Sequence, residues 1–187
     1  MKISVHNRQT RRRPNARKLA ALARFFMLQA ARSKVESRRL GTLQGGHAVC
    51  FALRNSTARH LKSEFPWAEV SVVLTDDAGI ALLNRTFLDH ACATDVITFT
   101  LAPMPGGGAG TCGEIYLNVE RALEEGARRG NAADELALYL AHGCDHLTGA
   151  NDRTVREQRR MRRRELLWLA QARQDGLMEG LWGRNAE

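Results

Sequence analysis

The chain has 187 residues, of which 44% are hydrophobic and 26% are charged, and its formal net charge at pH 7 is +8. This length favours a single domain with its own hydrophobic core over two full domains, and the apolar content argues against disorder throughout. No stretch approaches the roughly 20 apolar residues of a membrane span, and the basic charge favours a polyanionic partner, with nucleic acid preferred over an acidic membrane surface.

The first predicted elements are a strand and an amphipathic helix. Residues 2–6 alternate as a strand does, and residues 15–31 place apolar side chains at helical spacing, at Leu19, Leu22, Phe26 and Ala30. Basic residues ahead of the apolar run also fit a signal or transit peptide. Because Arg24 interrupts that run, a strand followed by a helix is the favoured interpretation.

The segment that follows is less regular. Residues 32–46 are charged and then rich in glycine, which indicates a linker or an excursion. Residues 47–54 fit either a strand or the start of a helix. We therefore expect one domain over residues 1–187 with a candidate insertion at about residues 32–66.

Buried strands alternate with helices in the middle of the chain. Strands are predicted at residues 70–74, 96–99 and 113–118, where apolar residues cluster. The polar triplet Thr75-Asp76-Asp77 supplies N-cap residues for a helix that ends at about Leu88, and a second helix is expected over residues 119–129.

The last part of the chain is predicted to be helical. Residues 103–112 hold two prolines and three consecutive glycines; they resemble a phosphate-binding loop, but no helix follows at once, so a connection between strands is favoured. Asn131 caps a long helix, and a final helix starts near Thr154 and reaches about Ala172. This order of elements predicts an α+β fold, a small mixed β-sheet packed with helices.

The segment His142–Asp152, HGCDHLTGAND, carries the chemistry. His142 and His146 are four residues apart on the predicted helix, so their side chains project from one face and can hold one metal ion. A ligand six residues further on requires a turn, and Gly149 stands where a left-handed cap ends a helix. That turn can bring Asp152 back to the metal.

Asp152 has a competing structural role as the cap of the last helix. Thr154 and Glu157 match a capping box, however, which satisfies the first amides of that helix and leaves Asp152 free. Two histidines and a carboxylate with an open fourth position are typical of a catalytic zinc site rather than a structural one. Gly143 occupies the position of the glutamate base of helix metalloproteases, which argues against peptide hydrolysis.

Four motifs follow one another along the chain: Leu83-Asn84, Thr94-Asp95-Val96-Ile97-Thr98-Phe99, Gly113-Glu114-Ile115 and His142-Gly143-x-x-His146-Leu147-x-Gly149. Together they resemble the motifs of the YbeY family of rRNA-maturation endoribonucleases. The resemblance covers about residues 68–156. It implies a mixed sheet of about four strands, one zinc ion held by a central helix and the following turn, and endoribonuclease activity.

Three positions depart from the family pattern. Asp152 stands where a histidine is the commonest third ligand, and Leu88 stands where the family commonly has a functional arginine. Arg85, one turn earlier, is the candidate to compensate. Asp145 replaces a usual leucine, and it either orients an imidazole or lies exposed.

The function that we expect is hydrolysis of RNA phosphodiesters by water that zinc activates, with zinc on His142, His146 and Asp152. The resemblance implies rRNA or ribosomal particles as partners, in rRNA processing and ribosome biogenesis in the cytoplasm. The alternative is a non-catalytic RNA-binding or ribosome-assembly factor that keeps the metal site; Leu88 favours it. A zinc hydrolase for another substrate is the third candidate.

Basic residues are the candidates for RNA binding. Seven arginines crowd the predicted helix after the metal motif, and a helical face can present several of them to phosphates. No aromatic residue is interleaved among them, so no sequence preference follows, and an ordinary solvated surface is the competing interpretation. The residues that we select are Arg12, Arg85, Arg156 and Arg160.

The remaining candidates receive structural interpretations. Asp95 is expected to accept structural hydrogen bonds. None of the four cysteines forms a CxxC pair, which disfavours a cysteine-only zinc site and favours reduced thiols. The histidines outside the motif are not expected to be ligands, and three large apolar residues near the end of the chain are expected to pack the tail onto the body or to meet a partner. The cysteines are Cys50, Cys92, Cys112 and Cys144, and the histidines outside the motif are His6, His47, His60 and His90. The residues expected to pack the tail or meet a partner are Trp168, Leu169 and Trp182.

Overall fold

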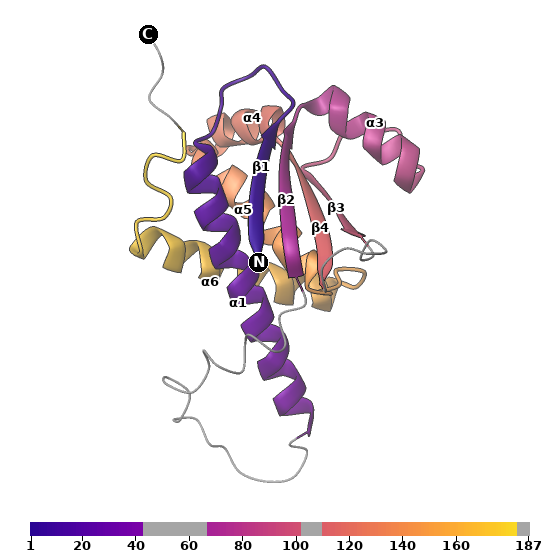
Figure 1. Cartoon of the computed structure of the whole chain (residues 1–187), viewed down its shortest axis with the longest axis vertical. Helices are drawn as coiled ribbons and strands as arrows, with labels where there is room; N and C mark the ends of the chain where they lie inside the picture. The colour runs from indigo at the N-terminus through magenta and orange to yellow at the C-terminus, as the bar shows by residue number, and fades with distance from the viewer. Residues whose placement is uncertain (43–66, 102–109, 183–187) are drawn as a thin grey trace.

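The computed structural model describes residues 1–42, 67–101 and 110–182. In chain order the elements are β1 (Lys2–Asn7), α1 (Ala16–Thr42), β2 (Trp67–Thr75), α3 (Asp77–Leu88), β3 (Val96–Leu101), β4 (Thr111–Asn118), α4 (Val119–Arg129), α5 (Ala132–Leu147) and α6 (Val155–Gln174). The predicted α+β class is confirmed (Figure 1).

The four described strands form one mixed sheet in the order β1-β2-β4-β3. β1 is parallel to β2, and β2 is parallel to β4. β3 runs antiparallel to β4 at the edge, with Thr98 opposite Ile115 and Phe99 opposite Glu114. Because successive side chains of a strand point to opposite faces, each strand offers one set of residues to the helices and one to the other face.

Helices cover one face of this sheet. α5 is the central helix, in contact with α1, α4, α6, β3 and β4. Figure 1 shows α4, α5 and α6 behind the sheet, whereas α3 stands apart from them at the upper right. The buried core lies between the sheet and these helices and includes Phe26, Val72, Ile115, Leu140 and Trp168.

α5 approaches the sheet closely because Gly143 has no side chain. A Cβ built at Gly143 would lie 2.7 Å from Ile115 Cγ2 and 3.2 Å from Val96 Cγ2. Real Cβ atoms do not tolerate the shorter of these distances, so a larger residue would push α5 away from β3 and β4. The residue after His142 therefore faces the sheet, and the position that holds a glutamate base in helix metalloproteases is here part of the packing.

Two predicted boundaries need correction or fall outside the described residues. We expected a linker from residue 32, but α1 continues to Thr42, since the residues after Arg32 include arginine, glutamate, lysine and leucine, which are good helix formers. The rest of the candidate insertion, residues 43–66, and residues 102–109 of the connection between β3 and β4 lie outside the described residues. Within the described residues, no helix is long and apolar enough to cross a membrane.

Candidate metal centre

α5 places the two histidines of the motif side by side. Asn131 caps the helix, since its side chain accepts a hydrogen bond from Ala133 N, as its position predicted. His142 and His146 are one turn apart, and their Nε2 atoms lie 3.0 Å from each other. Both imidazoles thus present the same nitrogen to one point.

Hydrogen bonds at the other ring nitrogen explain this orientation. Nδ1 of His146 lies 3.2 Å from the carbonyl oxygen of Ala150, which can only accept, so Nδ1 carries the proton and Nε2 keeps a lone pair. Nδ1 of His142 lies 2.7 Å from a carboxylate oxygen of Glu165. Donation to that carboxylate likewise directs the lone pair of His142 to Nε2.

The two imidazoles differ in their electrostatic surroundings. Burial and then the neighbouring His142 lower the pKa of His146, so this ring is neutral at neutral pH. Burial also lowers the pKa of His142, but the hydrogen bond and the charge of Glu165 outweigh burial and raise it overall. Glu165 therefore favours positive charge on His142, whereas burial and the neighbouring ring disfavour it on His146.

The turn after α5 is fixed by several hydrogen bonds. Gly149 adopts a φ of +92°, the left-handed conformation that its position predicted. Its amide donates to the carbonyl of His146 over 2.8 Å, and the ammonium of Lys34 in α1 donates to the carbonyl of Thr148 over 2.8 Å. These contacts return the chain toward the histidines.

The turn brings Asp152 to the histidine pair. Asp152 Oδ2 lies 3.8 Å from His146 Nε2, and one ligand atom from each of the three residues lies within 4.8 Å of the others. Asp152 does not cap α6, because Thr154 and Glu157 form the predicted capping box. The side chains are 28%, 26% and 41% exposed for His142, His146 and Asp152, so the cluster is open to solvent on one side.

The donor set fits a zinc ion. Zinc prefers nitrogen and oxygen ligands at about 2.0–2.2 Å in tetrahedral geometry, which separates neighbouring ligand atoms by roughly 3.3 Å. The 3.0 Å between the two nitrogens and the 3.8 Å from nitrogen to carboxylate bracket this value. Three protein ligands leave a fourth position for water or substrate, as in catalytic sites.

Asp145 takes neither of the two roles considered for it from the sequence. It is buried, and its Oδ2 accepts hydrogen bonds from Arg164 Nε at 3.0 Å and Arg164 Nη2 at 2.5 Å. α5 and α6 pack against each other, and this buried ion pair joins them. Both predicted roles were wrong, because Arg164 reaches Asp145 only through the packing of α6 on α5, which spacing within α5 does not indicate.

Glu165 is the carboxylate that orients His142, and the sequence analysis missed it. A signal was present: Glu165 lies at helical spacing with Met161, Leu169 and Ala172, all buried. An acidic residue on the apolar stripe of a helix requires a partner in the interior. The partner itself depends on tertiary packing and could not be identified from spacing.

We predict that Glu165→Gln weakens zinc binding by about tenfold to a hundredfold, because the amide keeps the size of the side chain but removes the charge behind His142. Competition against a chromophoric chelator measures the affinity. Glu124→Gln, an exposed residue of α4, removes the same charge elsewhere and should leave the affinity unchanged. Equal zinc affinities for the two variants would contradict this role.

Two of the predicted RNA-binding arginines lie away from the triad. Arg85 is exposed on α3, and α3 contacts the sheet through the edge-to-face pair Phe87–Phe99, with ring centroids 5.2 Å apart. Phe99 points to the face that α5 does not cover, so Arg85 belongs to an element on the opposite side of the sheet. The guanidinium of Arg12 lies 5.5 Å from the ring centroid of Trp182.

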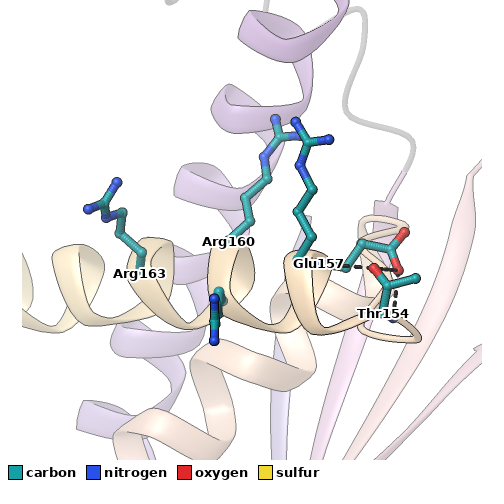
Figure 2. Close-up of a pocket in the computed structure, with 6 residues that line it drawn as sticks. Thr154, Glu157, Arg160 and Arg163 are labelled. Atoms are coloured by element: carbon teal, nitrogen blue, oxygen red, sulfur yellow. Dashed lines mark hydrogen bonds between the residues drawn. The ribbon is translucent and has the colours of Figure 1, made fainter.

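The other two line a basic hollow along α6. This hollow of about 830 Å³ is lined by Thr154, Arg156, Glu157, Arg159, Arg160 and Arg163. Figure 2 shows Arg160 and Arg163 projecting from α6, with Glu157 held against Thr154 at the helix start. The one acid of the lining, Glu157, is bound to Thr154 in the capping box, and the four arginines give the hollow a net positive charge that suits an anion.

The other sequence expectations have clear outcomes. Asp95 is a structural acceptor, with hydrogen bonds from Thr94 Oγ1 at 2.9 Å and from its neighbour's amide, Val96 N, at 3.0 Å. Trp168 and Leu169 are buried in the core. Cys92, Cys112 and Cys144 are free thiols, and His6 and His90 are exposed. Cys50, His47 and His60 lie outside the described residues.

Comparison with known families decides the relationship. The family model described as "Endoribonuclease YbeY" matches residues 47–173, which is more than half of the chain. The chain belongs to the YbeY family. This result confirms the resemblance drawn from the four motifs, and the YbeY match contains the whole of the triad.

Curated relatives carry the same YbeY description. A Cytophaga hutchinsonii endoribonuclease YbeY is 33% identical over 105 residues, which cover 56% of this chain and 71% of the relative. Anaeromyxobacter sp. and Salinibacter ruber proteins of that name are each 36% identical, over 52% and 51% of this chain and 51% and 65% of theirs. The chain thus spans between about half and seven tenths of the length of these relatives.

One solved structure also resembles the chain. The solution structure of a Thermotoga maritima protein aligns with a TM-score of 0.46 at 17% identity and covers 99% of both chains.

Proposed function

We propose that this chain is a metal-dependent endoribonuclease that cleaves structured RNA, with one zinc ion on His142, His146 and Asp152. The observation that carries the proposal is the convergence of the three ligand atoms within 4.8 Å of one another, in a member of a family described as endoribonucleases. We further propose rRNA or ribosomal particles in the cytoplasm as the setting. The motif resemblance supports this setting.

In this proposal the ion supplies the chemistry, and the protein residues hold the ligands in place and leave room for RNA. Zinc at such a site lowers the pKa of a water that binds it and stabilises negative charge on phosphoryl oxygens. Glu165 and the carbonyl of Ala150 hold the two rings in the tautomer that keeps Nε2 free for the ion. The partial exposure of all three ligands leaves an RNA backbone room to approach.

Arg156 and Arg160 would anchor the RNA at a distance from the cut. They line the basic hollow of α6, with guanidiniums that can bind phosphates in bidentate fashion. At about 100° per residue, Arg156 lies on the side of α6 opposite Glu165, which faces His142. These arginines are therefore proposed to hold neighbouring backbone rather than the phosphate that is cleaved.

A non-catalytic RNA-binding role is the second candidate, and one observation favours it. The carboxylates whose charge acts on His142 include Glu165, Asp95 and Asp152. Glu165 is bonded to His142, and Asp95 accepts hydrogen bonds from Thr94 and Val96. If Asp152 binds the metal, none of these three is left uncommitted as a general base.

The two candidates are separated by chelation and reconstitution. We expect purified protein to cleave a structured rRNA fragment, to lose this activity when a chelator removes the metal, and to regain it when zinc is added back. Gel analysis of the RNA products measures cleavage. Binding of the fragment without cleavage at any metal concentration would reject the enzymatic proposal and favour the second candidate.

A further inference from the structure

α6 runs antiparallel to α5, and ion pairs fix the register of the two helices. Arg173 pairs with Asp134 near the start of α5, and Glu165 contacts His142 near its end. The two pairs are separated by the same number of residues on each helix, from Asp134 to His142 on α5 and from Glu165 to Arg173 on α6. The other residues of α6 can therefore be matched to levels along α5. By this register Arg162 stands at the level of the last turn of α5, which carries His146.

The direction of Arg162 follows from the helix geometry. Arg162 precedes Glu165 by three residues, so the two side chains leave α6 about 60° apart and on the side that faces α5. The arginines of the basic hollow leave α6 at roughly 120–180° from Glu165. Arg162 therefore leaves α6 closer to the direction of Glu165 than those arginines do, and it does not line the basic hollow.

Arg162 lines a separate hollow between α6, α5 and the segment before β3. It has a volume of about 330 Å³ and is lined by Ala93, Thr94, Asp95, Arg121, Glu125, Arg129, Glu135, Leu138, Tyr139 and Arg162. Tyr139 precedes His142 by one turn of α5, and the charge of Asp95 acts on His142. The hollow thus lies on the part of α5 that precedes His142, and the triad residues do not line it.

Charges in this second hollow are satisfied except at Arg162. Arg129 is paired with Glu125 and Glu135, and Arg121 Nη1 donates to the carbonyl of Ala93 over 3.0 Å. Arg162 has no hydrogen-bond or ion-pair partner in the described part of the chain, and it is exposed. An arginine with all its donors free, one turn from the glutamate that contacts His142, is suited to an anionic substrate.

We propose that Arg162 positions an RNA phosphate at the triad, an assignment that rests on the proposed function. Its guanidinium donates to a non-bridging phosphoryl oxygen, while the polar second hollow receives the adjoining ribose or base. Arg162 moves no proton and breaks no bond; it fixes the phosphate next to the three ligands.

The test compares Arg162→Gln with Arg24→Gln, an exposed arginine of α1 whose loss removes the same charge elsewhere. Two measurements are made: kcat/KM for RNA cleavage by zinc-loaded protein, and binding of a fluorescent RNA of about six nucleotides to metal-free protein. We expect Arg162→Gln to lower kcat/KM by about tenfold to a hundredfold and to weaken binding by about tenfold. Arg24→Gln should change neither.

A chemical-rescue experiment excludes a merely structural role. Arg162→Ala should regain cleavage when guanidinium is added, at ionic strength matched with sodium chloride. Arg162→Lys should keep part of the activity, because lysine restores the positive charge but not the planar guanidinium that can bind two phosphate oxygens. The melting temperatures of these variants should equal that of the wild type, because Arg162 has no partner to lose.

The outcomes separate this inference from the proposed function. If the wild type binds the short RNA but does not cleave it, and Arg162→Gln weakens binding, the phosphate site stands while the catalytic proposal fails. If Arg162→Gln and Arg24→Gln bind and cleave alike, the inference is overturned while the catalytic proposal remains. If the wild type neither binds nor cleaves RNA, both are overturned.

Discussion

His146→Ala is expected to reduce RNA cleavage to the level of a protein-free sample. Alanine removes one of the three ligands, and the remaining histidine and carboxylate cannot hold zinc tightly enough to support the reaction. Folding should survive, since His146 is partly exposed and contributes one hydrogen bond to Ala150; we expect a loss of about 1 kcal/mol in the free energy of unfolding. Gel-based cleavage and chemical denaturation measure the two effects.

A matched control makes this result specific. His90→Ala removes an exposed histidine just after α3 and should leave cleavage unchanged. A contaminating nuclease is excluded by purifying His142→Ala in parallel, which should also be inactive. Cleavage by His146→Ala at the wild-type rate would show that another part of the protein, or another protein, cuts the RNA.

Arg164→Met is expected to be the most destabilising of the substitutions considered. It leaves the carboxylate of Asp145, whose side chain is 3% exposed, without its partner, and uncompensated buried charges cost about 3–5 kcal/mol. The guanidinium of Arg164 also lies 5.7 Å from the ring centroid of Trp168. Urea unfolding followed by circular dichroism measures the loss.

The loss should depend on pH in a defined direction. Burial raises the pKa of Asp145 to about 6, well above the usual range of an aspartate, even though Arg164 opposes the shift. A raised pKa in the folded state means that the free energy of unfolding falls as the pH rises through that window. Without Arg164 the pKa of Asp145 rises further. The difference in the free energy of unfolding between wild type and variant should therefore be smallest at about pH 5 and largest at about pH 8.

The double variant Asp145→Asn/Arg164→Met provides the control for charge. It removes both members of the pair, so it should be more stable than Arg164→Met alone at pH near 8, because no buried carboxylate remains. A double variant that is less stable than Arg164→Met would contradict the view that the buried charge of Asp145 causes the loss.

The clustering of His142, His146 and Asp152 could be predicted from the sequence because its geometry is local. Two histidines four residues apart share a face of any helix, a glycine can end that helix, and Thr154 with Glu157 accounts for the next helix start. Each of these inferences requires only the periodicity of one helix or one turn. The structure places Asp152 beside the two histidines as this reasoning expected.

The supporting contacts could not be predicted because they join distant parts of the chain. Glu165 meets His142, and Asp145 meets Arg164, only because α6 docks antiparallel on α5. The docking depends on which faces of two helices are buried together, and several registers satisfy the same apolar pattern. The length of α1 was underestimated for a different reason: charged residues were interpreted as a linker although they form helices well.

The central claim is that three side chains hold one metal ion, and zinc titration tests it most directly. Metal-free wild-type protein should bind one equivalent of zinc per chain with submicromolar affinity, a strength on the order of that expected for a three-ligand protein site, and His146→Ala should bind none at the same zinc concentrations. Wild-type protein that binds no zinc, or a His146→Ala variant that binds one equivalent as tightly, would contradict the account.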